Sequence, residues 1–159
     1  MLWGMVLMSS IKLSEEDQRV CLQVAHQSIK HGLEKGSALN VVTGDYSAAL
    51  QQELACFVTL HENGQLRGCI GALEAYQPLM GGIAVHAYAA AFKEPRFMAV
   101  KEKEFEKLEL DISVLGKPEA MTFTSEDDLL RQVRPGIDGL ILEYADNRGT
   151  FLPSVWEQL

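Results

Sequence analysis

The residues with the clearest chemical potential lie in one hexapeptide, LRGCIG, at positions 66–71. Arg67 stands two residues before Cys69, and Gly68 and Gly71 flank that cysteine. Residues i and i+2 of a strand have Cα atoms roughly 6.5–7 Å apart, so the Arg67 guanidinium can reach the Cys69 thiol and stabilise a thiolate. Both are candidate catalytic residues, Cys69 as a nucleophile or redox thiol and Arg67 as its cation or as the contact for an anionic substrate.

Simpler interpretations of the hexapeptide compete with this one. Cysteine is among the most buried residue types, and burial in apolar surroundings raises a thiol pKa, so Cys69 also fits a small core position. Gly68 and Gly71 are expected where a strand bulges, or where another backbone or a ligand comes close, which makes them candidate ligand-binding positions. Their spacing fits neither a dinucleotide fingerprint nor a phosphate-binding loop.

The remaining potential sites are weaker. His26 and His31 are five residues apart in an expected helix, whereas helical metal ligands are spaced by three or four. The sequence has neither CxxC nor HExxH, so we expect no metal and no cofactor. His86 is most simply a hydrogen-bonded structural residue. Glu109 and Asp111 fit the solvated face of a strand better than an acid/base pair.

A predicted β-hairpin positions the hexapeptide. In ACFVTLHENGQLRGCIG, residues 55–71, two apolar or β-branched runs flank the Asn63-Gly64 dipeptide, which suits a type I′ turn. Arg67 and Cys69 then share a face with apolar residues of the first strand. Both faces carry apolar groups, so we expect the hairpin to be covered on two sides. The predicted register pairs Glu62 with Gln65, Leu60 with Arg67, Val58 with Cys69, and Phe57 with Ile70.

Other elements alternate irregularly along the chain. Apolar spacing and capping residues predict helices from Ser14 to about residue 34, from Pro78 to Glu94 and from Glu126 to about Val133. Strict alternation of apolar and polar residues predicts a strand over Leu108–Leu115, and GLILEY and TFLPSVW predict further extended segments. Because strands and helices do not alternate regularly, we expect an α+β fold with a mostly antiparallel sheet and flanking helices.

Composition limits the possible partners. The 159 residues fit one domain of ordinary size. A net charge of −8 argues against nucleic acid, whose binding needs clustered Lys and Arg. Three cysteines with no close pair suit a reducing compartment, so we expect a cytoplasmic protein. Residues 1–13 are expected to be a disordered or loosely docked N-terminal extension, with Met5 and Met8 as alternative starts and an apolar run too short for a membrane span.

Several separated segments resemble the AMMECR domain family, whose hallmark is the LRGCIG hexapeptide. The similarity covers most of the chain from about Ser14, and its motifs follow the order expected of the family. It implies one α+β domain over residues 14–159 with two small subdomains around antiparallel sheet, and it implies no particular reaction. The matching segments are ACFVTLHENGQLRGCIG, AAAFKEPRF, LELDISVLG and GIDGLILEYADNRGTFLPSVWEQL.

The resemblance also implies which residues form the site. It points first to the whole hexapeptide, Leu66 to Gly71, which includes Ile70. It points more weakly to Arg96 in the PRF turn and to Arg148 in NRGT. Relatives usually have Asp where Glu94 stands, and they commonly continue beyond VWEQ, so we expect the usual C-terminal segment to be absent. Some bacterial members are encoded beside a Memo-like protein and a radical SAM protein, which are partner candidates by analogy only.

Two functions therefore stay open. In the first, the protein is a binding module that recognises a protein or a small anionic ligand through the LRGCIG surface, and Arg67 matters more than Cys69. In the second, it is an enzyme or a radical-SAM-associated accessory that uses Cys69 as a nucleophile or redox thiol and Arg67 to stabilise a thiolate or an anionic substrate. No base, metal or cofactor motif accompanies Cys69, which favours the binding module.

Overall fold

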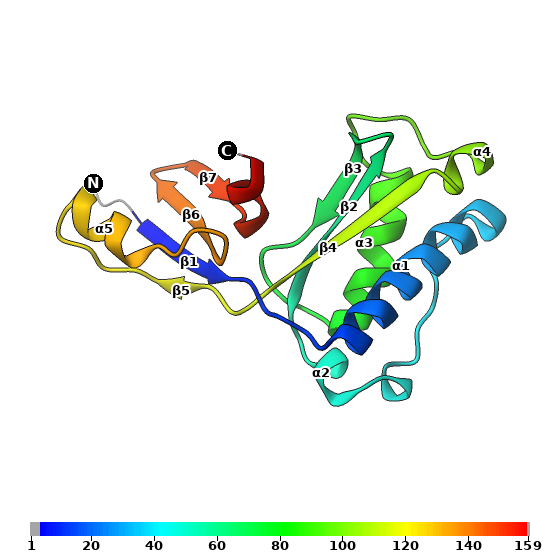
Figure 1. Ribbon diagram of the computed structural model, residues 1–159, viewed down its shortest axis with the longest axis horizontal. Coiled ribbons are helices and arrows are strands. Elements are labelled where there is room, and N and C mark those ends of the chain that lie inside the picture. The colour runs from blue at the N-terminus through cyan, green and yellow to red at the C-terminus, as the bar shows by residue number, and fades with distance from the viewer. Residues whose placement is uncertain (1–3, 159) are drawn as a thin grey trace. The chain divides into compact units, whose positions relative to one another are not determined.

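The computed structural model describes residues 4–158, which fall into two compact units (Figure 1). The hairpin unit is Lys12–Val114, and the β1 unit combines Met1–Ile11 with Leu115–Leu159. Each unit has its own antiparallel sheet, of three strands in the first and four in the second, together with helices. The predicted α+β class is therefore confirmed. Among the described residues, no helix is both long enough and apolar enough to span a membrane.

The hairpin unit is a three-stranded sheet, in the order β3-β2-β4, whose one face packs against helices (Figure 1). Helix α3 lies directly on β2 and β3, and α1 packs on α3. Short helical turns fill the connections. The elements of this unit are α1 (Glu15–Lys35), η1 (Thr43–Asp45), α2 (Ala48–Gln51), β2 (Ala55–Glu62), β3 (Gln65–Gly71), α3 (Leu79–Phe92), α4 (Glu102–Phe105) and β4 (Leu108–Leu115).

Local sequence explains the long helix α1. The Ser14 side chain accepts a hydrogen bond from the Asp17 backbone at 3.1 Å, which satisfies one of the free amides of the first turn. Gly36 ends the helix in the left-handed region at a φ of 75°, which glycine adopts without strain. The expected start at Ser14 is confirmed, and the helix ends at Lys35, close to the predicted end near residue 34. The apolar stripe is buried and joins α3 and the sheet in one core; it contains Cys21, Val24, Ala25 and Ile29.

The hairpin forms at the predicted turn, with a register that changes beside it. Asn63 and Gly64 have φ values of 54° and 76°, as a type I′ turn requires. The pairing of Glu62 with Gln65 is confirmed, but the register shifts between Leu60 and His61, so that Arg67 is an extra residue on β3. The predicted partners of Arg67, Cys69 and Ile70 are therefore wrong by one. The observed pairs are Leu60 with Gly68, Thr59 with Cys69, Val58 with Ile70, and Phe57 with Gly71.

The shift also corrects the predicted faces. Val58 and Leu60 are fully buried in the core with α3, and the partners of these residues are Ile70 and Gly68. Cys69 alternates with them and lies on the other face, opposite Thr59. Side chains on that face are half-buried or exposed, so the expected cover on two sides is found on the helical side alone.

The β1 unit is a four-stranded sheet in the order β5-β1-β6-β7. Residues 4–9 of the expected N-terminal extension form β1, which pairs with a neighbour on each side, and Met8 is completely buried. The expectation of disorder is corrected for these residues; residues 1–3 lie outside the described part. The sequence did not predict a strand here, because its apolar residues follow one another without alternating with polar residues. The elements are β1 (Gly4–Ser9), β5 (Glu119–Ala120), α5 (Glu126–Gln132), β6 (Asp138–Tyr144), β7 (Asn147–Phe151) and η2 (Pro153–Gln158).

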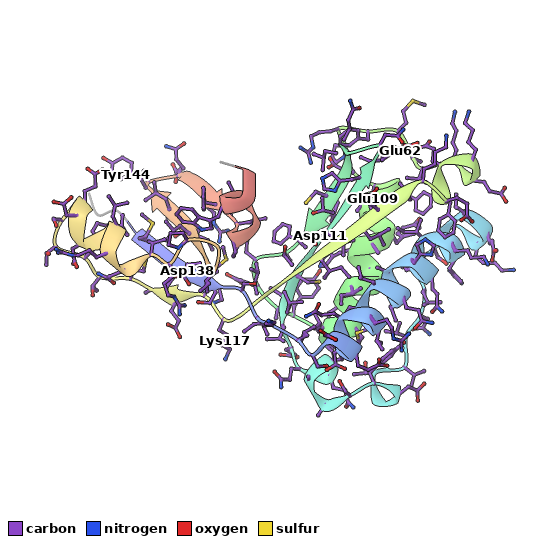
Figure 2. The ribbon with its side chains drawn as sticks, in the orientation of Figure 1. Glu62, Glu109, Asp111, Lys117, Asp138 and Tyr144 are labelled. Atoms are coloured by element: carbon purple, nitrogen blue, oxygen red, sulfur yellow. The ribbon has the colours of Figure 1, made fainter. Side chains whose placement is uncertain are left out.

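A buried carboxylate fastens the end of β1. Asp138, labelled in Figure 2, is fully buried and accepts a hydrogen bond from the Ser9 hydroxyl at 3.0 Å. The Arg134 guanidinium donates to both of its oxygens, at 2.9 and 3.0 Å, and holds the pKa of Asp138 below its ordinary value. Trp156 donates to the Asp138 carbonyl at 2.8 Å. These bonds tie the first strand of the chain to its last segments.

Candidate functional site

Arg67 projects from the bulge and is held by protein atoms. Its Nε donates to Glu104 Oε2 at 2.8 Å, and its Nη2 donates to the Met98 carbonyl at 2.7 Å. Glu62, at the turn end of the hairpin (Figure 2), places a carboxylate oxygen 3.9 Å from the same Nε. The side chain is only 13% exposed, and its Nη1 has no hydrogen-bond partner among the described residues. The Glu104 carboxylate therefore neutralises the charge of Arg67 within the protein.

The bond between Arg67 and Glu104 links two segments far apart in sequence. The guanidinium holds the pKa of Glu104 below its ordinary value, mainly by donating a hydrogen bond to the carboxylate. Glu104 lies in α4, and its side chain is 18% exposed. The ion pair thus fixes the hairpin to the segment that follows α3.

Cys69 contacts Thr59 and Glu94. Its sulfur lies 3.3 Å from the Thr59 hydroxyl on β2, and either atom can donate. Its backbone N–H donates to Glu94 Oε2 at 3.2 Å. The residue is half-buried, whereas Cys21 and Cys56 are buried. The structure records no contact between the Cys69 sulfur and Arg67 in the part of the chain that it describes.

A second arginine, Arg96, shares a hydrogen-bond partner with Cys69. Arg96 is held by Glu94, whose carboxylate accepts from the Arg96 Nη2 at 2.6 Å, from its Nε at 3.1 Å and from its backbone N–H at 3.1 Å. These bonds lower the pKa of Glu94 to about 2, against the opposing effect of burial. The pKa of Arg96 is raised chiefly by its hydrogen bonds to Glu94 and by the charge of that carboxylate. Arg96 is therefore linked to Cys69 through the Glu94 carboxylate, which accepts hydrogen bonds from both residues.

An aromatic ring joins the two arginines. The guanidinium carbons of Arg67 and Arg96 lie 5.9 and 5.6 Å from the centre of the Phe97 ring, within the range of cation–π attraction. Next to this ring Met98 is 77% exposed, and Leu66 beside Arg67 is 40% exposed. We call this group the arginine surface; it comprises Leu66, Arg67, Cys69, Arg96, Phe97 and Met98.

Both glycines of the hexapeptide are explained by close packing. A Cβ on Gly68 would collide with the carbonyl oxygen of Ala90 in α3. A Cβ on Gly71 would collide with the carbonyl oxygen of Cys56 on β2. Protein backbone, rather than a ligand, accounts for the absence of side chains at these two positions.

The other predicted residues have environments of their own. Arg148 belongs to the β1 unit, where it pairs with Glu143 at 3.4 Å. His86 is buried in α3, and burial lowers its pKa. Glu109 and Asp111 are exposed on β4 (Figure 2), as a solvated strand face requires. Among the described residues, no group of three or more His, Cys, Asp or Glu side chains is arranged to hold a metal ion.

Sequence reasoning missed the carboxylates that organise the surface. The sequence distinguishes Glu94 only as a departure from the Asp of relatives, and it does not distinguish Glu104 from the neighbouring glutamates. One signal was available, because two arginines beside apolar strands need acidic partners. The glutamates of the 94–106 segment are the nearest such residues after α3 in sequence, but spacing alone does not say which of them turns inward.

Comparisons with known proteins agree with the fold. The model of the AMMECR1 family matches residues 22–159. A protein of Methanothermobacter thermautotrophicus is 36% identical over 143 residues, covering 90% of this chain and 74% of the relative. Protein MJ0810 of Methanocaldococcus jannaschii is 36% identical over 117 residues, covering 72% and 58%. The crystal structure of the uncharacterized protein PH0010 from Pyrococcus horikoshii superimposes with a TM-score of 0.82 at 31% identity, covering 91% of this chain and 73% of that one.

Proposed function

Because the chain belongs to the AMMECR1 family, and because that family membership assigns no reaction, we propose that it is a protein-binding module that acts through the arginine surface. The observation that carries this proposal is the exposure of two apolar residues beside the largely buried Arg67, namely its chain neighbour Leu66 and Met98, whose carbonyl accepts a hydrogen bond from Arg67. Met, Arg and aromatic residues are enriched at protein interfaces, and Met98, Arg67, Arg96 and Phe97 bring these residue types together here.

The charges favour a protein over a small anion. Arg67 is neutralised by Glu104 at 2.8 Å, and Arg96 by Glu94 at 2.6 Å. A free anion would have to compete with both carboxylates. The apolar atoms of Met98 need no such exchange, and burying them in a complex is favourable by about 25 cal/mol per Å². This reasoning selects one of the two ligand classes that the sequence left open.

An enzyme based on Cys69 is the second candidate. One observation favours it, namely that Cys69 is half-buried and that its backbone N–H shares the Glu94 carboxylate with the Arg96 guanidinium. The other two cysteines provide an internal control, since burial raises the pKa of Cys21 to about 11 and that of Cys56 to about 12. If Cys69 is a nucleophile, iodoacetamide will modify it at pH 7 much faster than free cysteine while Cys21 and Cys56 stay unmodified. A rate equal to that of free cysteine or lower excludes this candidate.

Capture of partners by an affinity-tagged chain tests the binding module. The proteins retained by the parent chain are quantified by mass spectrometry and compared with those retained by the Met98→Ala and Leu66→Ser variants. We expect both variants to lose the specific partner at least tenfold, because each removes apolar contact without touching the core. Cys69→Ser is expected to retain it. Arg67→Ala is also expected to lose it, but that variant loses the Glu104 ion pair as well and is less informative.

Val42 supplies a matched control. It is an apolar side chain of the same unit, 64% exposed, and lies just before η1. Val42→Ala therefore removes a comparable exposed group outside the arginine surface. Equal losses in Val42→Ala and Met98→Ala contradict the proposal, as does full retention in Met98→Ala and Leu66→Ser.

A further inference from the structure

The outer edge of β3 carries a backbone donor that no strand satisfies. In the order β3-β2-β4, β3 has a neighbour on one side only. Alternate residues of an antiparallel edge strand direct their N–H groups away from the partner strand. Cys69 is such a residue, since its N–H donates to the Glu94 side chain instead of to β2. The edge is thus closed at this point by a carboxylate.

Four N–H groups converge on that carboxylate. The backbone N–H of Cys69 and the Nε and Nη2 groups of Arg96 donate to Glu94 Oε2 at 3.2, 3.1 and 2.6 Å. The backbone N–H of Arg96 donates to Glu94 Oε1 at 3.1 Å. The Glu94 side chain is 4% exposed, whereas that of Arg96 is 58% exposed. A guanidinium fork with added backbone amides is the donor set with which proteins bind carboxylates. Here the carboxylate belongs to the protein itself.

We propose that the Cys69 amide, the Arg96 amide and the Arg96 guanidinium form a carboxylate-binding site that Glu94 occupies as an internal ligand. An external carboxylate binds there when Glu94 is withdrawn, and it approaches from the exposed side of Arg96. Because Glu94 is tethered two residues from Arg96, its effective concentration is high and the site is closed in the free protein. The inference is separate from the proposed protein partner, since the site can be opened and filled in the purified chain.

The direct test is chemical rescue of a Glu94→Ala variant by sodium acetate. Removing the carboxylate leaves the four donors unpaired around a space that acetate fits. We expect acetate to raise the melting temperature of this variant saturably, with half-saturation at about 10 mM, and to move the ¹⁵N resonance of the Cys69 amide with the same midpoint. Sodium chloride at equal ionic strength is expected to do neither.

Two matched proteins separate this site from general effects of acetate. The parent chain keeps its own carboxylate in the site, so the Cys69 resonance should not move. Glu94→Gln keeps the side-chain volume and fills the same space with an amide, so acetate should have at most a tenth of its effect on Glu94→Ala. A response of equal size in either protein places acetate elsewhere and overturns the inference.

The result remains decisive if Glu94→Ala folds poorly. In that case refolding yield is measured with acetate and with chloride, and only a gain specific to acetate supports the site. The absence of any acetate effect on stability, resonance and yield overturns the inference. A blocked Gly-Asp-Gly peptide then identifies the source of the ligand: rescue by acetate alone indicates small carboxylates, and rescue by the peptide as well indicates acidic side chains.

Discussion

At the scale of single residues, Arg67 stabilises the site through internal contacts, and little of its side chain is exposed to a ligand. Its guanidinium lies between Glu104 and the Met98 carbonyl, and only 13% of its side chain is exposed. A partly buried ion pair of this kind is costly to break, because removing one partner leaves the other charge without compensation. This explains how an arginine fits a strand that packs on the hydrophobic core.

A double-mutant cycle between Arg67→Ala and Glu104→Gln is expected to give a coupling energy of about 1–3 kcal/mol. The physical reason is the short hydrogen bond between two side chains that are each less than a fifth exposed. Urea unfolding of the four proteins measures it. Arg131 and Asp128 serve as the control pair, since their atoms are 3.9 Å apart and Arg131 is 74% exposed. A coupling no larger than that of the control, about 0.5 kcal/mol or less, contradicts this role for Arg67.

Glu94 is expected to make stability depend on acid pH. Its pKa is lowered in the folded protein to about 2 from an ordinary value of 4.5. A group whose folded pKa is depressed stabilises the fold above its unfolded pKa, and that contribution is lost as the pH falls from about 4.5 toward 2. The parent chain should therefore lose more stability than Glu94→Gln between pH 6 and pH 3 in urea unfolding. Equal losses in the two proteins contradict the assignment.

At the scale of elements, the bulge in the hairpin decides what the hexapeptide displays. The extra residue, Arg67, shifts the register so that Gly68 faces α3 and Cys69 faces the opposite side. Without the bulge, Cys69 would lie on the helical face with Val58 and Leu60. The segment from Glu94 to Met98 then covers the edge of β3 through two hydrogen bonds, to Cys69 and to Arg67.

Gly68→Ala is expected to destabilise the protein by about 1–3 kcal/mol, because its Cβ would collide with the backbone of α3 at Ala90. Chemical denaturation measures the change. Gly44→Ala is the matched control, since no atom lies within 4 Å of a Cβ at that position and the substitution should alter stability by less than about 0.5 kcal/mol. Similar losses of stability in the two variants would contradict the close contact between Gly68 and the backbone of α3.

The elements could be predicted from the sequence, but the placement of side chains in the site could not. The Asn63-Gly64 turn, the Ser14 cap and the alternation of Leu108–Leu115 each depend on neighbouring residues, and all three are confirmed. The bulge at Arg67 occurs beside the close contact of Gly68 with α3, and such a contact between distant segments leaves no signal in the local sequence. Glu94 and Glu104 were missed for the same reason.

At the scale of the whole chain, the N-terminal strand β1 belongs to the same unit as the C-terminal part of the sequence. The chain forms β1, then the entire hairpin unit, and then returns to supply β5, β6 and β7. In the order β5-β1-β6-β7, β1 alone joins β5 to the rest of its sheet. Residues 4–9 are therefore structural, although their sequence suggested an extension.

Deletion of residues 1–9 is expected to disrupt the β1 unit and spare the hairpin unit. The deletion removes Met8 from the core and the Ser9 hydroxyl from Asp138, and it separates β5 from β6. Hydrogen exchange should show lost protection in Asp138–Tyr144 and retained protection in Glu15–Lys35. Protection that is unchanged in β6, or lost equally in α1, contradicts this division.

Binding of a protein through the arginine surface is the central claim, and site-specific photo-cross-linking in cells of the source organism tests it most directly. A photoreactive residue is placed at Met98 in one protein and at Val42 in another, both positions being well exposed in the same unit. The account predicts a discrete adduct with one protein from position 98, absent from position 42 and unaffected by Cys69→Ser. No adduct from position 98, or the same adducts from both positions, would contradict it.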